Sequence, residues 1–302
     1  ASLPSSLRRE LPSQMSGRVP SLVSPAWLAA RLPAVKVVDA SWYLPAMGRD
    51  GKAEYAARRI PGARHWDLDA TDDPSDLPHM LPSPGFFADS MAALGVTSDD
   101  HIVAYDGKGI FSAPRLWWCL RAFGHDRASV LDGGLPAWVG EGHAVDEGPP
   151  PPPLSGGGGF NAALRPEAVW TRAQVAANVG SRAALVVDAR ALARFEGRAP
   201  EPRANCRSGR IPGSRCVPFT EVLTEDGKMK AEAELRAAFA AGGVDVAAAP
   251  ALALSCGSGV TASVLALALD QLGVAAPVYD GSAAEWLSRD DTPIETGPVE
   301  AA

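Results

Sequence analysis

A cysteine opens a glycine-containing loop that lies between an apolar strand-like run and an apolar helix-like run, Ser255-Cys256-Gly257-Ser258-Gly259-Val260-Thr261. Two glycines within four residues let the backbone curl so that successive N–H groups point inward. Such a nest at a helix N-terminus binds anions, and its amide dipoles favour the thiolate of a cysteine placed there. We therefore predict that Cys256 is a nucleophile and that the loop around it forms an anion site.

Two other classes of site share features of this loop. Gly257, Gly259 and Ala262 fit the G-x-G-x-x-G/A pattern of a dinucleotide site, and Asp280 follows after about 20 residues. That pattern leaves the cysteine unexplained. A cysteine phosphatase also holds a thiolate among backbone amides, but it needs an arginine that closes the loop on the phosphate dianion. The position where that arginine is expected is Ala262, and the loop carries no Arg or Lys. The missing cation disfavours a phosphatase, and the unexplained cysteine disfavours a dinucleotide site.

The composition bounds the class of protein. The chain has 302 residues, 46% hydrophobic and 21% charged, which is ordinary for a globular protein and long enough for two domains. A net charge of −7 argues against a general nucleic-acid binder, and the absence of a long apolar run predicts no membrane span. The four cysteines, none in a C-x-x-C pair, form neither a zinc ribbon nor a disulfide framework, which favours a reducing compartment. They are Cys119, Cys206, Cys216 and Cys256.

The chain divides near its midpoint, and its halves resemble each other. Residues 148–159 contain runs of five prolines and four glycines, which is typical of a linker. Three motifs recur in order at offsets of 151, 149 and 148 residues, which indicates an internal duplication. They are Arg59–Arg64 with Arg210–Arg215, Val37–Ala40 with Val186–Ala189, and Leu131–Gly134 with Tyr279–Ser282. We predict a flexible tail or transit-peptide remnant at 1–20 and domains at 21–147 and 160–298.

Short apolar runs alternate with helical stretches in both halves. This alternation predicts two α/β domains, each a parallel β-sheet flanked by helices. The expected strands are Val35–Asp39, Ile102–Asp106, Leu185–Asp188 and Ala251–Ser255, and the expected helices are Pro84–Leu94, Ala113–Phe123, Glu232–Ala241 and Ala262–Leu272. In the first half, Asp106 aligns with Cys256, and a carboxylate there cannot act as a sulfur nucleophile. The first half therefore reads as a copy that kept the scaffold and lost the chemistry.

These residues resemble a known family, the tandem-rhodanese sulfurtransferases, and within it the 3-mercaptopyruvate sulfurtransferases of plant or algal type. The resemblance covers nearly the whole chain, from about Val23 to Gly297. The motifs that carry it are Asp39–Pro45, Leu77–Pro82, Tyr105–Ala113, Asp188–Arg190, Arg194–Arg203 and Cys256–Thr261. It implies two rhodanese-like domains with the active site between them and the nucleophile in the second. No metal or organic cofactor is implied.

The resemblance also assigns site residues. It implies that Arg194 and Arg203 bind the substrate carboxylate, since a guanidinium grips a carboxylate through two hydrogen bonds. It places Ser258, His79 and Asp69 in a catalytic relay that moves a proton, although the neighbouring acids leave the choice of carboxylate open. The resemblance also implies that the substrate contacts the loop itself. The loop residues concerned are Gly257, Gly259, Val260 and Thr261, and the neighbouring acids are Asp67, Asp72 and Asp73.

The neutral loop suggests the sulfur donor. Relatives that use thiosulfate carry basic residues just after the cysteine, whereas Gly257 and Ser258 stand here and suit a monoanion such as 3-mercaptopyruvate. The predicted reaction passes sulfur through a Cys256 persulfide to cyanide or to a thiol such as thioredoxin or a small dithiol, and releases pyruvate. A thiosulfate:cyanide sulfurtransferase and a non-catalytic persulfide carrier are the alternatives. The predicted compartment is mitochondrial, with cytoplasm or plastid as alternatives.

Overall fold

Two parallel sheets, one in each half of the chain, form the framework of the protein. The structure is a computed structural model that describes residues 19–152, 159–203, 205–249 and 251–299. The first sheet has the strand order β1-β6-β5-β2-β4 and the second has β8-β12-β11-β9-β10. All strand pairs within these two sheets are parallel, and the two orders correspond strand for strand. The duplicated motifs therefore reflect a duplicated fold.

The strands of both sheets are short. The first sheet contains β1 (Leu22–Val23), β2 (Lys36–Asp39), β4 (Arg64–His65), β5 (Ile102–Tyr105) and β6 (Ala128–Leu131). The second contains β8 (Val169–Trp170), β9 (Leu185–Asp188), β10 (Arg215–Cys216), β11 (Leu252–Ser255) and β12 (Val278–Tyr279). A separate antiparallel ribbon joins β3 (Arg58–Arg59) and β7 (Asp146–Glu147). The central strands β5 and β11 are buried along their whole length, as expected for parallel strands covered on both faces.

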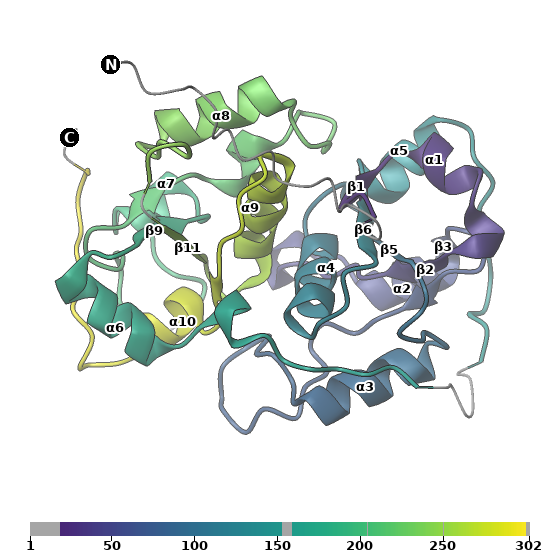
Figure 1. Ribbon diagram of the computed structural model, residues 1–302, viewed down its shortest axis with the longest axis horizontal. Helices are drawn as coiled ribbons and strands as arrows, with labels where there is room; N and C mark the ends of the chain where they lie inside the picture. The colour runs from purple at the N-terminus through teal and green to yellow at the C-terminus, as the bar shows by residue number, and fades with distance from the viewer. Residues whose placement is uncertain (1–18, 153–158, 204, 250, 300–302) are drawn as a thin grey trace, which may run out of the picture.

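Helices cover the faces of both sheets (Figure 1). The first half carries α1 (Pro25–Ala29), α2 (Gly51–Ala57), α3 (Pro84–Ala93), α4 (Ala113–Ala122) and α5 (Gly134–Gly140). The second carries α6 (Arg172–Ser181), α7 (Leu192–Phe195), α8 (Glu232–Ala241), α9 (Val260–Gln271) and α10 (Ser282–Trp286). Short 3-10 turns lie at Leu32–Ala34, Pro45–Met47, Pro166–Ala168 and Phe219–Val222. The predicted strands and helices are confirmed to within two residues, and Gly124 and Gly273 have the left-handed backbone expected after a helix.

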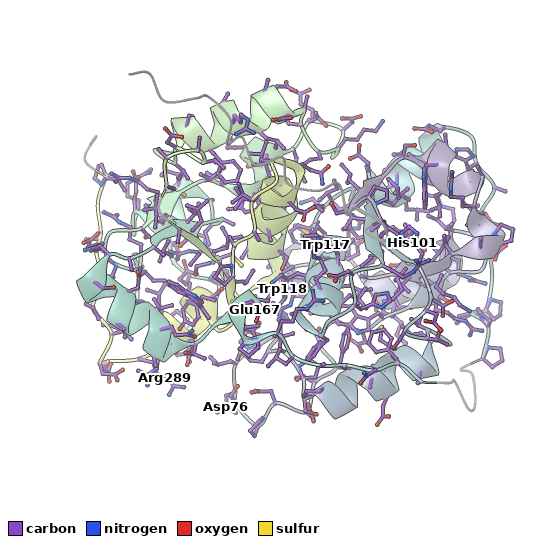
Figure 2. The ribbon with its side chains drawn as sticks, viewed as in Figure 1. Asp76, His101, Trp117, Trp118, Glu167 and Arg289 are labelled. Atoms are coloured by element: carbon purple, nitrogen blue, oxygen red, sulfur yellow. The ribbon has the colours of Figure 1, made fainter. Side chains whose placement is uncertain are left out.

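Helices α4 and α9 pack against each other and join the two halves (Figure 1). Every residue of α9 from Ala262 to Leu269 is buried, which is the pattern of a helix enclosed on all sides. A single hydrophobic core contains Leu116 and Leu120 from α4 together with Leu265 and Leu269 from α9. Figure 2 shows two further α4 side chains, Trp117 and Trp118, among those that fill this boundary. The halves are therefore fixed relative to each other, as a site built from both requires.

The segment that connects the two sheets packs against the first half. Arg59 donates hydrogen bonds to the carbonyls of Gly148 and Pro149, and the main chain of Ala163 and Arg165 bonds to the carbonyls at the end of α4. Residues 159–165 thus pack on the first half, although the predicted boundary puts 160–165 in the second domain. The predicted tail at 1–20 lies outside the described residues up to position 18, as do residues 153–158 of the linker.

Candidate active site

The loop from Cys256 to Gly259 connects strand β11 to helix α9. Gly259 precedes the helix with φ +79°, a left-handed conformation that favours glycine, and no side chain caps the first turn. The amides of Gly257, Ser258, Val260 and Thr261 have no hydrogen-bond partner in the described part of the chain. They add to the positive end of the α9 dipole, so the loop can hold an anion. Cys256 is buried at the base of this loop.

Ser282, at the start of α10, fixes the same loop through hydrogen bonds to its main chain. Its Oγ accepts hydrogen bonds from the amides of Cys256 at 3.2 Å and Gly259 at 3.1 Å, and donates to the carbonyl of Tyr279 at 2.7 Å. The amide of Gly259 is therefore occupied by the protein itself. Ser282 has φ +48°, an uncommon conformation for a residue other than glycine, and it is fully buried. Apart from its place in the duplicated Tyr279–Ser282 motif, nothing in the residue pattern indicated this contact.

The structure brings Ser258, His79 and Asp69 together. His79 Nδ1 lies 2.8 Å from Ser258 Oγ, and His79 Nε2 lies 3.1 Å from Asp69 Oδ1. Trp42 Nε1 donates to the other oxygen of Asp69 at 3.0 Å, and the Trp42 ring packs edge-on against the imidazole. The chain of contacts thus runs from a loop of the first half to the residue two positions after Cys256.

This geometry also separates Asp69 from the neighbouring acids. Asp67 accepts a hydrogen bond from the amide of Asp69, Asp72 bonds to Ser83, and Asp73 bonds to Ser75. Among the described residues, Asp69 alone of these acids contacts the imidazole of His79.

Burial and pairing set the charge states of this group. Burial lowers the pKa of His79, although the nearby Asp69 carboxylate acts in the opposite direction. The hydrogen bond from His79 lowers the pKa of Asp69. His79 is therefore neutral at neutral pH, with one ring nitrogen free to accept a proton from Ser258.

Arg190, Arg194 and Arg203 come after β9 in the chain, and they have different surroundings. Arg190 is buried and bonds to Asp188, Glu201 and the carbonyl of Gly209, so its role is to connect these three segments of the second half. Arg194 pairs with both oxygens of Glu201, at 3.1 Å and 2.5 Å, and its guanidinium lies over Gly257, where an added Cβ would approach it to 3.3 Å. Sequence reasoning missed Glu201 as the acid that orients Arg194.

Arg203 has no such partner. Its guanidinium makes no hydrogen bond or ion pair with any residue that the structure describes, and its charge acts on Asp69, His79 and Cys206. Arg194 thus lies beside the loop at Gly257, and Arg203 brings a second positive charge near Asp69 and His79, with no partner for its guanidinium among the described residues. Each guanidinium can bind an anionic group such as a carboxylate.

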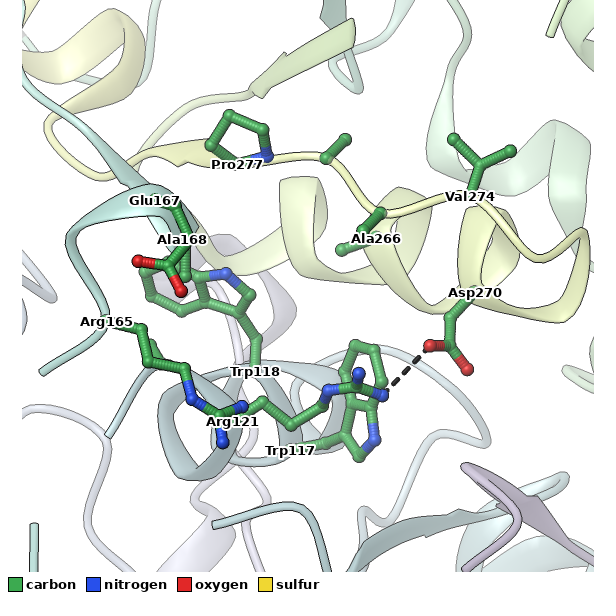
Figure 3. A pocket seen from close by; sticks show the side chains of 13 residues that line it. Trp117, Trp118, Arg121, Arg165, Glu167, Ala168, Ala266, Asp270, Val274 and Pro277 are labelled. Atoms are coloured by element: carbon green, nitrogen blue, oxygen red, sulfur yellow. Dashed lines mark hydrogen bonds and ion pairs between the residues drawn. The ribbon is translucent and has the colours of Figure 1, made fainter. Parts of the chain in front are cut away.

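A separate cavity of about 380 Å³ lies at the other end of α9. Its wall includes Trp117, Trp118, Ala266 and Pro277, and an ion pair between Arg121 and Asp270 lies at its edge (Figure 3). It contains none of the residues that the sequence predicts for catalysis. Among the described residues, no group of His, Cys, Asp and Glu side chains could hold a metal ion, and no helix is long and apolar enough to cross a membrane.

Comparisons with known proteins agree with this architecture. Residues 24–141 match the rhodanese-like domain model. The chain is 40% identical over 297 residues to thiosulfate/3-mercaptopyruvate sulfurtransferase 1, mitochondrial, of Arabidopsis thaliana, with 91% of this chain and 78% of the relative covered. The thiosulfate sulfurtransferase of Bos taurus is 43% identical, with 91% and 94% covered. The chain belongs to the rhodanese-fold sulfurtransferases.

A solved structure from the same family shows the same fold. It is described as the crystal structure of SseA from Escherichia coli, with the rhodanese fold and catalytic mechanism of 3-mercaptopyruvate sulfotransferases. It superposes with a TM-score of 0.78 at 40% identity and covers 87% of this chain and 99% of its own. The predicted class, two rhodanese-like α/β domains, is confirmed.

The first half of this sulfurtransferase contains the counterpart of the active loop, and there Asp106 stands at the position of Cys256. Its carboxylate accepts hydrogen bonds at 2.9 Å from the amides of Lys108, Phe111, Ser112 and Ala113. Asp106 is fully buried, and burial raises its pKa. The amides of the duplicated loop therefore bind a carboxyl group supplied by the chain. In the loop at Cys256, the amides of Gly257, Ser258, Val260 and Thr261 have no such partner among the described residues.

Proposed function

We propose that this sulfurtransferase uses 3-mercaptopyruvate as its donor and carries the sulfur as a persulfide on Cys256. The observation that carries the proposal is the contact between Ser258 and His79 directly beside the nucleophile. A neutral serine at this position replaces the positive charge that a thiosulfate dianion would need. It also supplies a hydroxyl that can exchange a proton with a substrate thiol.

The first half-reaction starts from the thiolate of Cys256. Its sulfur attacks the sulfur of 3-mercaptopyruvate, so that an S–S bond forms and the C–S bond breaks. The electron pair of that bond leaves with the carbon as the enolate of pyruvate. The proton of the substrate thiol passes through Ser258 to His79 and then to the enolate carbon, so pyruvate is released and Cys256 holds an anionic persulfide.

The second half-reaction returns the enzyme to its starting state. A thiolate or cyanide attacks the outer sulfur, and Cys256 leaves as a thiolate. The open amides of Gly257, Ser258, Val260 and Thr261 stabilise the persulfide anion between the two steps. Arg194 and Arg203 hold the substrate carboxylate, with Glu201 orienting Arg194. The two half-reactions predict ping-pong kinetics.

The acceptor and the compartment belong to the same proposal. A persulfide needs a thiol near it, and thioredoxin or a small dithiol fits this chemistry as acceptor. The identity of 40% to a relative named mitochondrial supports a mitochondrial location. Steady-state turnover with reduced thioredoxin and its reductase, followed by NADPH oxidation, tests the acceptor. No increase over the reaction without thioredoxin would reject it.

Donor specificity tests the proposal as a whole. We expect kcat/KM with 3-mercaptopyruvate to exceed kcat/KM with thiosulfate by more than about tenfold, which is about 1.4 kcal/mol of transition-state discrimination. Cys256→Ser is the control and should lose activity with both donors. A preference for thiosulfate would support the alternative that the bovine thiosulfate sulfurtransferase represents. Absence of turnover without a protein donor would support a persulfide carrier.

A further inference from the structure

A buried arginine of the first half contacts the main chain of His79. Arg115, on α4, is 1% exposed, and its Nη2 donates to the carbonyl of His79 at 2.5 Å. The same Nη2 donates to Asp280 Oδ1 at 2.6 Å. Asp280 follows β12 in the second half, so this contact crosses the boundary between the halves.

Asp280 also holds the chain on the other side of His79. Its second oxygen accepts a hydrogen bond from the amide of Leu81 at 2.8 Å. The Arg115–Asp280 pair thus grips the main chain immediately before and after Met80. His79 has φ +61°, a left-handed conformation that is unfavourable for a residue other than glycine and persists where its surroundings hold it.

Arg115 also reaches the catalytic loop. A Cβ added to Gly259 would lie 2.6 Å from Arg115 Nη1, so the guanidinium fills the space that the missing side chain leaves. The guanidinium lies over the ring of Trp118 at 4.6 Å. One buried cation therefore contacts both the segment that carries His79 and the loop that carries Ser258.

Comparison of the two duplicated halves shows which of these contacts both halves share and which one occurs only beside His79. In the first half, Asp132 follows β6 and accepts a hydrogen bond from the amide of Met229 at 2.9 Å, just as Asp280 accepts one from Leu81. The main-chain contact is therefore present in both halves. The position that corresponds to Arg115 is Leu265, by the offset that aligns Asp106 with Cys256, and it is a buried apolar side chain. The guanidinium is present only on the side that holds His79.

We infer that the Arg115–Asp280 pair is a positioning device that fixes the imidazole of His79 against Ser258. The inference rests on the proposed relay. The pair does not contact the reacting sulfur. It acts through His79, and removing it lets the imidazole move away from the serine hydroxyl. A displacement of about 1 Å at such a group costs up to about a hundredfold in rate.

A double-mutant cycle tests this inference. Two variants remove the contact, Arg115→Met, and Arg115→Met combined with Asp280→Asn, which leaves no unpaired buried charge. Each is made in the wild-type chain and in His79→Ala, and kcat and KM for 3-mercaptopyruvate are measured. Arg121→Met combined with Asp270→Asn is the matched control, because this ion pair also links α4 to the second half and lines the separate cavity at the other end of α9.

We expect kcat to fall at least tenfold in the wild-type chain, with KM changed less than about threefold, and to change less than about twofold when His79 is already absent. The control pair should leave kcat within about twofold in both backgrounds. Equal losses of kcat in both backgrounds would overturn the inference, as would unchanged kcat or failure of both variants to fold. If His79→Ala alone kept full activity, the proposed relay itself would fail.

Discussion

Ser258 Oγ lies 2.8 Å from His79 Nδ1, and the two residues come from opposite halves of the chain. In the proposed mechanism, this contact gives a function to the duplicated half, which has no nucleophile of its own. The first half supplies the imidazole, the carboxylate of Asp69 and the buried guanidinium of Arg115, while the second supplies Cys256 and the open amides. Neither half contains all of these groups.

The pH dependence of the reaction tests the role of Asp69. Burial lowers the pKa of His79 below the ordinary histidine pKa of about 6.5, so the imidazole stays neutral at pH values somewhat below 6.5. The acid limb of the pH profile of kcat/KM should therefore lie below pH 6.5. The Asp69 carboxylate favours the protonated imidazole. Asp69→Asn should therefore move the acid limb to lower pH, and it should lower kcat by about tenfold or more because the ring loses its orienting partner.

Asp72→Asn is the matched control for this prediction. Asp72 lies in the same loop but bonds to Ser83 instead of His79, so its replacement should leave the acid limb in place. An acid limb that moves to higher pH in Asp69→Asn would contradict the assignment.

Arg203→Ala tests carboxylate binding. The free guanidinium should provide a charge-assisted hydrogen bond to the substrate, worth about 1.5–3 kcal/mol. Its loss should raise KM for 3-mercaptopyruvate by roughly 10- to 100-fold and leave kcat within about threefold. Arg198→Ala is the control, because Arg198 is exposed and pairs with Glu196. An unchanged KM in Arg203→Ala would remove Arg203 from the site.

A change of loop charge should change the donor. Gly257 has no left-handed strain, and an added side chain would meet the movable end of Arg194 at 3.3 Å. The double change Gly257→Arg and Ser258→Lys supplies the cations that suit a dianion and removes the hydroxyl bonded to His79. We expect kcat/KM to fall about a hundredfold or more with 3-mercaptopyruvate and to rise with thiosulfate. Gly257→Ala should keep the original preference, and a double variant that also kept it would refute the neutral-loop argument.

Asp106→Asn tests whether the duplicated loop of the first half has only a structural role. The amide group of asparagine cannot accept all four hydrogen bonds that the carboxylate accepts from the backbone. At least one of these amides would then face the NH2 group instead of an acceptor, which should lower the free energy of unfolding in urea by about 1–3 kcal/mol. The kcat of the folded variant should remain unchanged. A large loss of kcat with unchanged stability would show that this loop takes part in the reaction.

Much of the fold follows from local sequence patterns. The apolar run Ile102–Tyr105 is buried along its whole length, and helix Glu232–Ala241 buries its apolar side chains Leu235 and Phe239. The duplicated motifs relate the two halves. The position of the residues just after the linker could not be predicted from local patterns. Residues 159–165 stay on the first half because their main chain bonds to Phe123 and Ala122, contacts that no local pattern encodes.

The residues of the candidate site that lie in one loop could be predicted from the sequence. Those that reach it from distant segments were harder to assign. Cys256 is marked by its own glycines, but several acids precede His79 at similar spacing. Only the folded chain shows that Asp69 reaches the imidazole while Trp42 holds its second oxygen. Ser282 and Glu201 likewise act through contacts with loops that are remote in sequence, so their residue types alone carry no signal.

The persulfide on Cys256 is the central claim, and mass spectrometry of the intact protein and its peptides tests it most directly. After incubation with 3-mercaptopyruvate and removal of excess donor, the peptide that contains Cys256 should gain the mass of one sulfur atom. The gain should disappear on addition of cyanide or a thiol, and Cys256→Ser should show none. An unmodified Cys256 in protein that still turns over, or a sulfur carried on Cys206 instead, would contradict the account.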